Sequence, residues 1–357
     1  MSARIDLLNL DRHELEQALV DLGAPRYRGR QVFRWLYRGG ATDFAAMANL
    51  GREVREKLAT AFTIAFPAMA SQQTSSDGTT KFLLALADAR HIEAVFIPDT
   101  PSQTFCISTQ VGCAIGCTFC LTGKMGLTRH LTAGEIAGQV RLLAPATGLA
   151  AAPFNIVLMG MGEPLHNYDA TMKALGILAD EEGLAMPPRR MTLSTVGILP
   201  ALERLATAPL MPNLAISLHA TTDELRSQLV PINRRYPLKD LLDACRRFPL
   251  ARRRRITFEY VLLDRVNDTP EDARRLVRLL HGIKAKVNLM PLNEAAGIPF
   301  KRPSDERVNA FARLLADRGV RVMVRKSRGR DIRAACGQLI IESEQRSIGQ
   351  RLAMQMK

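Results

Sequence analysis

The sequence predicts an α/β protein built on a partial (β/α)6 TIM-like barrel, preceded by a small helical domain and a short β extension. Three patterns support this prediction: helical periodicity in residues 11–62, strand-like segments in residues 68–98, and six strand–helix units after residue 103. Alternating strands and helices of this kind form parallel sheets. A doubly wound open sheet would give the same order of elements, so the pattern allows both arrangements.

Residues 1–65 are expected to form a basic helical domain. Asp11 is placed to cap a first helix, whose apolar stripe is Leu15, Leu19 and Leu22. A second helix is expected from about Gly29 to Tyr37. The arginines in and around this second helix are Arg26, Arg28, Arg30, Arg34 and Arg38.

Residues 66–98 are expected to form a short β extension. Ser76–Asp77–Gly78 is a turn signal between two candidate strands, and His91–Pro98 is a third. The barrel would then occupy residues 99–331, and residues 332–357 would form a C-terminal segment. The six barrel strands are predicted at Phe105–Val111, Phe154–Met159, Met191–Thr195, Asn213–Leu218, Ile256–Leu263 and Val287–Met290. Helices are predicted between them, for example at Ala133–Leu143, Asp169–Glu182, Leu238–Phe248 and Thr269–Leu280.

The charge of the chain points to an anionic partner. Lys and Arg number 49 and Asp and Glu number 35, which gives a net charge of +14. Such an excess favours binding to RNA or DNA, although a solvated arginine-rich surface would give the same count. Aromatic residues are only 5% of the chain, which argues against a base-stacking platform and in favour of phosphate contacts. The basic clusters are Arg189–Arg190, Arg234–Arg235, Arg252–Arg255 and Lys326–Arg333.

The sequence shows no sign of export or of membrane insertion. Residues 1–20 contain no apolar signal-peptide core, and no run of 18 apolar residues occurs, so we expect a cytoplasmic protein. Six cysteines in a cytoplasmic chain of this size indicate metal or redox chemistry rather than a disulfide framework.

Three of these cysteines form a tight triplet in the loop after the first predicted barrel strand. Cys113, Cys117 and Cys120 are spaced so that three thiolates can meet at one metal centre. Zinc sites usually have four closed ligands in two separated pairs, and a structural zinc loop would need a distant fourth ligand here. An iron–sulfur cluster with three protein ligands would instead leave one iron open for a substrate or a cofactor.

The triplet, with Thr122–Gly–Lys–Met–Gly126 and Leu131–Thr–Ala–Gly–Glu135 after it, resembles the radical S-adenosylmethionine superfamily. More narrowly, the chain resembles the dual-specificity adenine C2 RNA methyltransferases over nearly its whole length. The resemblance implies one 4Fe–4S cluster with an open iron site on the three cysteines. It also implies two molecules of S-adenosylmethionine per turnover.

The expected cofactor-binding residues follow the carboxyl ends of predicted strands, where barrel enzymes build their active sites. Alone, each has an ordinary structural explanation, such as a turn, a cap or a core histidine; their common face and their order favour a site. The resemblance assigns cofactor binding to Gly162, Glu163, Ser194, Ser217, Leu218, His219 and Asn293.

Two further cysteines and one carboxylate complete the predicted site. Cys336 follows Arg325, Lys326, Arg328, Arg330 and Arg333, and such cations stabilise the nucleophilic thiolate. The resemblance implies that Cys336 accepts a methyl group and later forms a transient disulfide with Cys106. Glu93 matches the proton acceptor of the family, although Cys106 could also take the proton. Cys245 matches no family site and is expected to be structural.

The resemblance also predicts partners. These are adenines of 23S ribosomal RNA at the peptidyl-transferase centre and of transfer RNA beside the anticodon, and an electron donor such as flavodoxin with its reductase. The N-terminal helices and Arg252–Arg255 are candidate RNA contacts, and we expect a monomer. Three alternatives stay open: C8 methylation of the same rRNA adenine, a radical enzyme with a non-RNA substrate, and a non-catalytic metal-stabilised RNA-binding protein.

Overall fold

The structure is a computed structural model that describes residues 4–98 and 103–341. Residues 1–3, 99–102 and 342–357 of the predicted domains lie outside this description. No helix within the described part combines the length and the apolar character that a membrane span requires.

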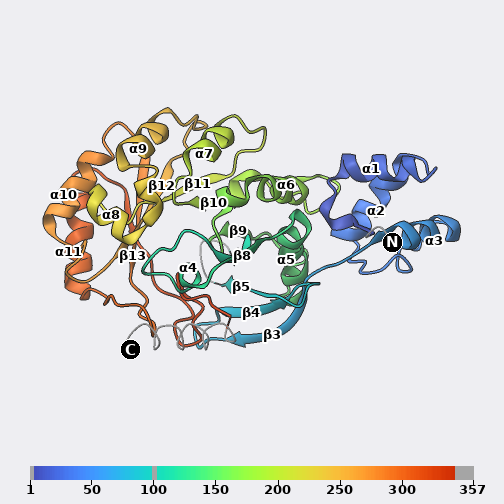
Figure 1. Ribbon diagram of the computed structural model, residues 1–357, viewed down its shortest axis with the longest axis horizontal. Coiled ribbons are helices and arrows are strands. Elements are labelled where there is room, and N and C mark those ends of the chain that lie inside the picture. The colour runs from blue at the N-terminus through green and yellow to red at the C-terminus, as the bar shows by residue number, and fades with distance from the viewer. Residues whose placement is uncertain (1–3, 99–102, 342–357) are drawn as a thin grey trace.

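The N-terminal domain is helical, as predicted, and lies at one end of the molecule (Figure 1). Asp11 caps the first helix through a capping box with Glu14, and Leu15 and Leu19 are buried. The second helix buries Val32, Phe33, Leu36 and Tyr37. The elements are β1 (Ile5–Asp6), the 3-10 helix η1 (Leu7–Asn9), α1 (Arg12–Asp21), α2 (Tyr27–Tyr37), α3 (Arg52–Ala61) and β2 (Phe62–Thr63).

The barrel is the partial barrel predicted from the sequence. Seven strands pair in parallel in their order along the chain, so every crossover moves in the same direction, which is the topology of a barrel rather than of a doubly wound sheet. These strands are β6 (Thr104–Cys106), β9 (Asn155–Leu158), β10 (Met191–Thr195), β11 (Asn213–Ser217), β12 (Ile256–Leu262), β13 (Ala285–Pro291) and β14 (Val322–Val324). The seventh strand, β14, was not predicted.

Helices cover the outer face of the sheet (Figure 1). They are α5 (Ala133–Ala146), α6 (Tyr168–Ala179), α7 (Leu199–Ala206), α8 (Asp223–Leu229), α9 (Leu238–Arg247), α10 (Pro270–Leu279) and α11 (Asp305–Ala316). Short 3-10 turns η2 (Pro164–Asn167), η3 (Pro188–Arg190) and η4 (Pro231–Arg234) lie in the connections.

The predicted β extension is part of the same sheet. Strands β3 (Ala68–Thr74), β4 (Thr80–Ala85) and β5 (His91–Ile97) form an antiparallel meander, and β5 pairs with β6. The described sheet therefore has ten strands, with β14 and β3 at its two edges.

The predicted strand Phe105–Val111 is wrong as a single element. The chain forms β6, leaves the sheet, and then forms β7 (Gln110–Cys113), which pairs with β8 (Gly126–His130) in a separate ribbon. The break has a physical cause at Ser108, because the buried side-chain amide of Gln139 binds both its backbone N–H, at 2.8 Å, and its carbonyl, at 2.9 Å. These two bonds replace the ladder that would have continued the strand.

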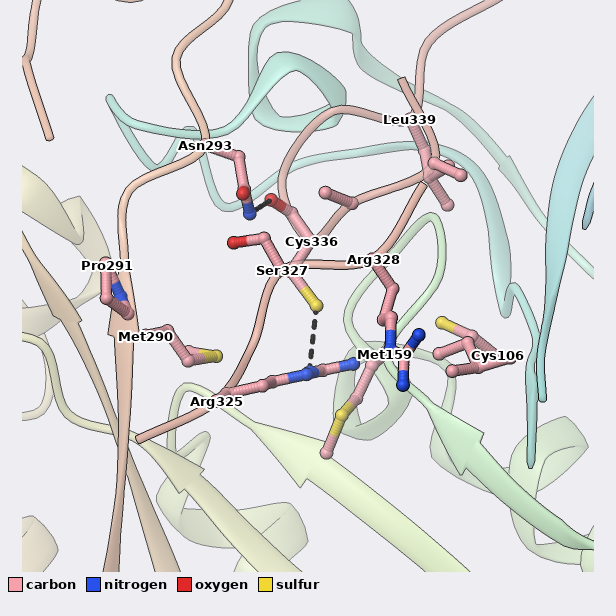
Figure 2. Close-up of a pocket in the computed structure, with 13 residues that line it drawn as sticks. Cys106, Met159, Met290, Pro291, Asn293, Arg325, Ser327, Arg328, Cys336 and Leu339 are labelled. Atoms are coloured by element: carbon pink, nitrogen blue, oxygen red, sulfur yellow. Dashed lines mark hydrogen bonds between the residues drawn. The ribbon is translucent and has the colours of Figure 1, made fainter. Parts of the chain in front are cut away.

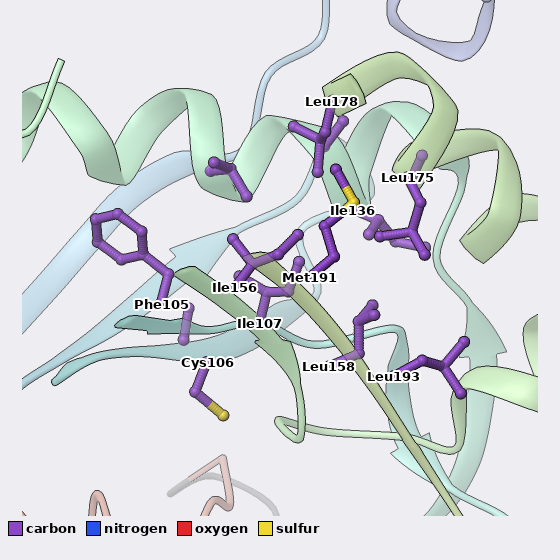
Figure 3. Close-up of a cluster of buried hydrophobic side chains, with 14 of the residues drawn as sticks. Phe105, Cys106, Ile107, Ile136, Ile156, Leu158, Leu175, Leu178, Met191 and Leu193 are labelled. Carbon is purple, nitrogen blue, oxygen red and sulfur yellow. The ribbon is translucent and has the colours of Figure 1, made fainter. Parts of the chain in front are cut away.

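The core between sheet and helices explains how β6 presents Cys106. Phe105 and Ile107 are fully buried and pack toward α5 and α6 (Figure 3). Successive side chains of a strand point to opposite faces. Cys106 therefore faces the interior of the barrel, as Figure 3 shows.

The N-terminal domain contacts the barrel through a glycine of α5. A Cβ on Gly134 would lie 2.6 Å from the Cβ and 2.8 Å from the carbonyl carbon of Leu8 in η1. We predict that Gly134→Ala lowers the free energy of unfolding by about 1–3 kcal/mol, because the backbone at Leu8 must move. Thermal denaturation would measure this loss as a lower melting temperature.

The matched control is Gly176→Ala on the neighbouring helix α6. A Cβ there meets no atom within 4 Å, so replacing a helical glycine should stabilise the protein by up to about 1 kcal/mol. Equal melting temperatures for the two variants would contradict the proposed contact.

Candidate active site

The cysteine triplet lies between the β7–β8 ribbon and the barrel. Cys113 ends β7, and the loop leads through Cys117 and Cys120 into α4 (Leu121–Met125). Gly123 allows α4 to approach this loop, since a Cβ there would lie 2.9 Å from the backbone nitrogen of Cys117. All three cysteines line one cavity at the carboxyl ends of the barrel strands.

The three thiols are in surroundings that disfavour free thiolates. Burial, followed by repulsion from Cys120, raises the pKa of Cys113 to about 12. Burial also raises the pKa of Cys117 well above its usual value, and that of Cys120 to a lesser degree. A metal centre that binds here must therefore displace protons and supply positive charge.

The three thiols are not gathered as the ligands of one metal ion would be. Within the described ranges, no three His, Cys, Asp or Glu side chains are arranged around one point as for one metal ion. In a cluster each thiolate binds its own iron, so the ligands stand further apart than those of a zinc ion.

The cavity beside the triplet contains about 920 Å³ of space, part of it open to solvent. The predicted cofactor residues that line it are Gly162, Glu163, Ser194, Ser217, His219 and Asn293, together with the three cysteines and Cys336. Leu218 differs, because its side chain is fully buried in the core.

Glu163 is a buried carboxylate in the wall of the cavity. Its two oxygens accept hydrogen bonds from the backbone N–H groups of Leu165, at 2.9 Å, and Val196, at 3.0 Å. Burial raises its pKa to about 6 despite these bonds. Gly162, with φ of 106°, precedes it where a Cβ would clash with Gln110 at 2.6 Å.

His219 is a neutral member of the wall. Burial, followed by the charge of Arg226, lowers its pKa to about 3. Its Nδ1 accepts a hydrogen bond from the backbone N–H of Val261 at 3.1 Å, so the ring proton is assigned to Nε2. His219 can therefore donate a hydrogen bond to a ligand.

Asn293 provides an unused acceptor. Its Oδ1 is buried without a hydrogen-bond partner among the described residues, while its Nδ2 donates to the carbonyl of Cys336 at 3.4 Å. Buried polar atoms are normally paired, so a ligand donor in the cavity would satisfy this oxygen.

Glu259 is a residue of the cavity that the sequence prediction missed. It is only 4% exposed, and it accepts a hydrogen bond from Ser194 Oγ at 2.6 Å. The signal that could have revealed it is an acidic residue in the middle of the apolar strand β12.

Cys106 and Cys336, which are far apart in the sequence, line one smaller cavity (Figure 2). Cys336 also lines the larger cavity beside the triplet, so it lies where the two meet. Figure 2 shows its sulfur directed at the guanidinium of Arg325, which donates to it at 3.0 Å. Burial, followed by the charge of Cys336, raises the pKa of Cys106 to about 12. Cys245 is buried in the core, away from both cavities.

Glu93 contacts the chain segment that carries Cys336. One of its oxygens accepts from the backbone N–H of Ile340 at 2.7 Å, and the other pairs with Lys81 at 2.9 Å. Glu93 is 3% exposed and lines neither cavity. Glu93 therefore contacts the segment that carries Cys336 without lining either of these two cavities.

The arginines that the sequence suggested as RNA contacts lie in several different parts of the structure. Arg34 pairs with Glu182, and Arg38 donates to the carbonyls of Glu181 and Gly183, so part of the N-terminal arginines hold this domain on the barrel. Arg252–Arg255 precede β12 and lie at the amino edge of the sheet, opposite the cavity.

Arg234 and Arg235 lie on the cavity side. They precede α9 and are exposed, and the neighbouring Leu229 accepts a hydrogen bond from Thr118 in the cysteine loop at 3.1 Å.

Comparison with known proteins identifies similar chains. Residues 107–280 match the radical SAM superfamily, and residues 5–64 match the ribosomal RNA large subunit methyltransferase N-terminal domain. A relative from Geobacter sulfurreducens, named dual-specificity RNA methyltransferase RlmN, is 50% identical over 339 residues, which cover 95% of this chain and 93% of the relative. A relative of the same name from Paracoccus denitrificans is 45% identical over 366 residues and covers 98% of this chain and 93% of its own.

A solved structure supports the same comparison. The crystal structure of a radical SAM methyltransferase from Sphaerobacter thermophilus has a TM-score of 0.89 at 49% identity, covering 94% of this chain and 99% of that chain. The similarity thus extends over the N-terminal domain as well as the barrel.

The ion pair between Lys81 and Glu93 generates a prediction about the site. Both side chains are largely buried, with 13% and 4% exposed. Lys81→Met would remove one buried ion pair of this carboxylate, so we expect the free energy of unfolding to fall by about 3–5 kcal/mol. Urea denaturation measures this change.

Lys57→Met is the control, because Lys57 forms an exposed pair with Glu53. Its loss should cost less than about 1 kcal/mol. A similar loss in both variants would show that the Lys81 pair does not stabilise the site.

Proposed function

This chain belongs to the RlmN family of dual-specificity RNA methyltransferases, and we propose that it methylates C2 of adenine in 23S ribosomal RNA and in transfer RNA. The observation that carries the proposal is that Cys106 and Cys336 share a cavity, and that Cys336 also faces the cavity lined by the cysteine triplet. A radical enzyme without a covalent protein intermediate would have no use for this arrangement.

The residues fit the cluster and the cofactor that the family implies. Cys113, Cys117 and Cys120 would hold a 4Fe–4S cluster with one open iron. Glu163 would accept from the ammonium or ribose of S-adenosylmethionine, and the unpaired Oδ1 of Asn293 would accept from another donor of this cofactor. Gly162, Ser194, Ser217 and His219 line the same wall. Leu218 would act indirectly, because its carbonyl accepts a hydrogen bond from Arg226 and so fixes the chain before His219.

The chemistry follows from the electronic character of the target carbon. C2 of adenine has no lone pair for ordinary methyl transfer, and the cluster with two molecules of S-adenosylmethionine, when bound, supplies a methyl donor and a carbon-centred radical. Cys336 accepts the methyl group, with formation of an S–C bond and loss of the thiol proton. The methyl carbon loses one hydrogen atom and then bonds to C2.

Release of the product uses the second thiol. The adduct loses the C2 proton and one electron, which the cluster held by the cysteine triplet would take up. Cys106 then attacks the sulfur of Cys336 and gives up its own proton. An S–S bond forms, the S–C bond breaks, and the released carbon takes a proton to become the methyl group. A reductant must then reopen the disulfide.

We propose Cys106 rather than Glu93 as the acceptor of the C2 proton. Cys106 lines the cavity that contains Cys336, whereas the oxygens of Glu93 are bound to Lys81 and Ile340. Glu93 would then serve the reaction by holding the segment that carries Cys336.

The RNA contacts proposed for the mouth of the site are phosphate contacts. Arg234 and Arg235 are exposed and follow α8, whose last residue, Leu229, accepts a hydrogen bond from Thr118 of the cysteine loop. Arginines on this edge would bind phosphate groups around an exposed adenine. A flavodoxin with its reductase is the proposed electron donor, and the enzyme would act as a cytoplasmic monomer.

The test is nuclease digestion of RNA after anaerobic reaction with the cluster-loaded protein. We expect 2-methyladenosine in wild-type reactions and a methyl group on Cys336 by intact-mass spectrometry. With Cys106→Ala, we expect a covalent protein–RNA species in place of free methylated RNA.

Each contrary outcome has a distinct meaning. Formation of 8-methyladenosine would show that the enzyme methylates C8 of adenine rather than C2. An unmodified Cys336 in a turning-over wild-type enzyme, or normal yields of free product from Cys106→Ala, would contradict the covalent route.

The raised pKa of Glu163 predicts how cofactor binding depends on pH. The carboxylate, which is the form that accepts from the cofactor, predominates above a pKa of about 6 and is lost as the pH falls. The affinity for S-adenosylmethionine should therefore weaken by about fourfold between pH 7 and pH 5.5, as the ionised fraction falls. Equilibrium dialysis of the cluster-loaded protein measures this change, and Glu163→Gln should bind weakly at every pH in this range. A profile for Glu163→Gln that matches the wild type would remove Glu163 from the cofactor site.

A further inference from the structure

Arg325 is placed by the sheet beside the two lone cysteines. It follows β14 directly, and its backbone N–H donates to the carbonyl of Leu289 in β13 at 2.8 Å. Its side chain is half-buried and lines the cavity of Figure 2. The barrel scaffold therefore fixes the base of this side chain.

The guanidinium has an unusual partner. Its Nη1 donates to Cys336 Sγ at 3.0 Å, and in the described part of the chain Arg325 forms no ion pair with a carboxylate. The charge of Cys336, ahead of those of Glu259 and Cys106, raises the pKa of Arg325. The guanidinium of Arg325 therefore interacts mainly with the sulfur of Cys336.

The two cysteines consequently differ in their surroundings. Cys336 receives a hydrogen bond from a cation, which stabilises a thiolate more than a thiol. Cys106 is 6% exposed and lies on β6 among apolar neighbours, and no cation in the described part of the chain donates a hydrogen bond to its sulfur. Of these two sulfurs, that of Cys336 is the one held in place by a cation.

We infer that Arg325 is a positioning residue that holds the Cys336 sulfur as the methyl acceptor and selects it over Cys106. The inference rests on the proposed function of Cys336. In the step concerned, the thiolate forms an S–C bond with the methyl carbon of S-adenosylmethionine, and the sulfonium S–C bond breaks to give a neutral thioether. A cation that orients the thiolate brings its electron pair into line with the breaking bond.

The experiment follows a single methyl transfer to the protein in the absence of RNA. Cluster-loaded wild type, Arg325→Met and Arg325→Lys are mixed anaerobically with S-adenosylmethionine, and peptide mass spectrometry follows the methyl group on Cys336 and Cys106 with time. We expect Arg325→Met to slow methylation of Cys336 by about tenfold to a hundredfold, which is the usual value of a charge-assisted hydrogen bond. Arg325→Lys should recover part of the rate, because a cation is restored.

Two further measurements separate positioning from a structural role. Cluster absorbance and binding of S-adenosylmethionine should be unchanged in both variants, and added methylguanidinium should accelerate Arg325→Ala but not the wild type. Arg274→Met, which removes an exposed cation of α10, is the control and should methylate Cys336 at the wild-type rate.

The outcomes distinguish this inference from the proposed function. If the wild type itself never carries a methyl group on Cys336, the proposed function fails. If the wild type is methylated and Arg325→Met is methylated equally fast, or if Arg325→Lys is no better than Arg325→Met, the role of Arg325 is overturned while the proposed function stands.

Discussion

The position of Cys336 depends on hydrogen bonds that tie the segment 336–341 to distant parts of the chain. The carbonyl of Gly337 accepts from the backbone of Leu121 at 2.8 Å, and that of Leu339 accepts from Thr122 Oγ1 at 2.7 Å. On its other side, the backbone N–H of Ile340 donates to Glu93. The segment has no regular secondary structure of its own among the described residues, so these bonds replace the ladder that would otherwise order it. The same bonds join the cysteine loop, the β extension and the C-terminal segment into one site.

The wall of the larger cavity is organised by a buried cation. Arg226 is fully buried, and its guanidinium donates to the carbonyls of Val196, Ser217 and Leu218 at the ends of β10 and β11. Burial lowers its pKa to about 10, so it remains charged near neutral pH. Because carbonyls rather than a carboxylate bind it, the positive charge is not cancelled within its own hydrogen-bond shell. Arg226 therefore makes the surroundings of Cys117 more favourable for an anionic cluster, while it fixes the strand ends that present the cofactor residues.

Local patterns predicted those parts of the molecule that depend on near neighbours in the sequence. The helix cap at Asp11, the parallel strands and the cysteine loop all follow from residues within one element or one loop. The break after β6 was not predictable, because it depends on Gln139, which reaches Ser108 from another element. The same reason explains why the pairing of Lys81 with Glu93 could not be anticipated. The family resemblance also assigned Leu218 to the site, although its side chain, directly after the end of β11, is buried in the core.

The net charge of the sequence does not predict which face of the protein binds RNA. A charge of +14 attracts a polyanion over long distances, but it does not determine which face the polyanion meets. In this structure arginines of the N-terminal domain bind acidic and carbonyl groups of the barrel, and the run Arg252–Arg255 lies at the edge opposite the cavity. Under the proposed function, orientation of an RNA toward the site would come from the smaller number of cations at the carboxyl edge, such as Arg234 and Arg235. A general excess of charge raises the encounter rate, whereas local cations of this kind would orient the RNA at the cavity.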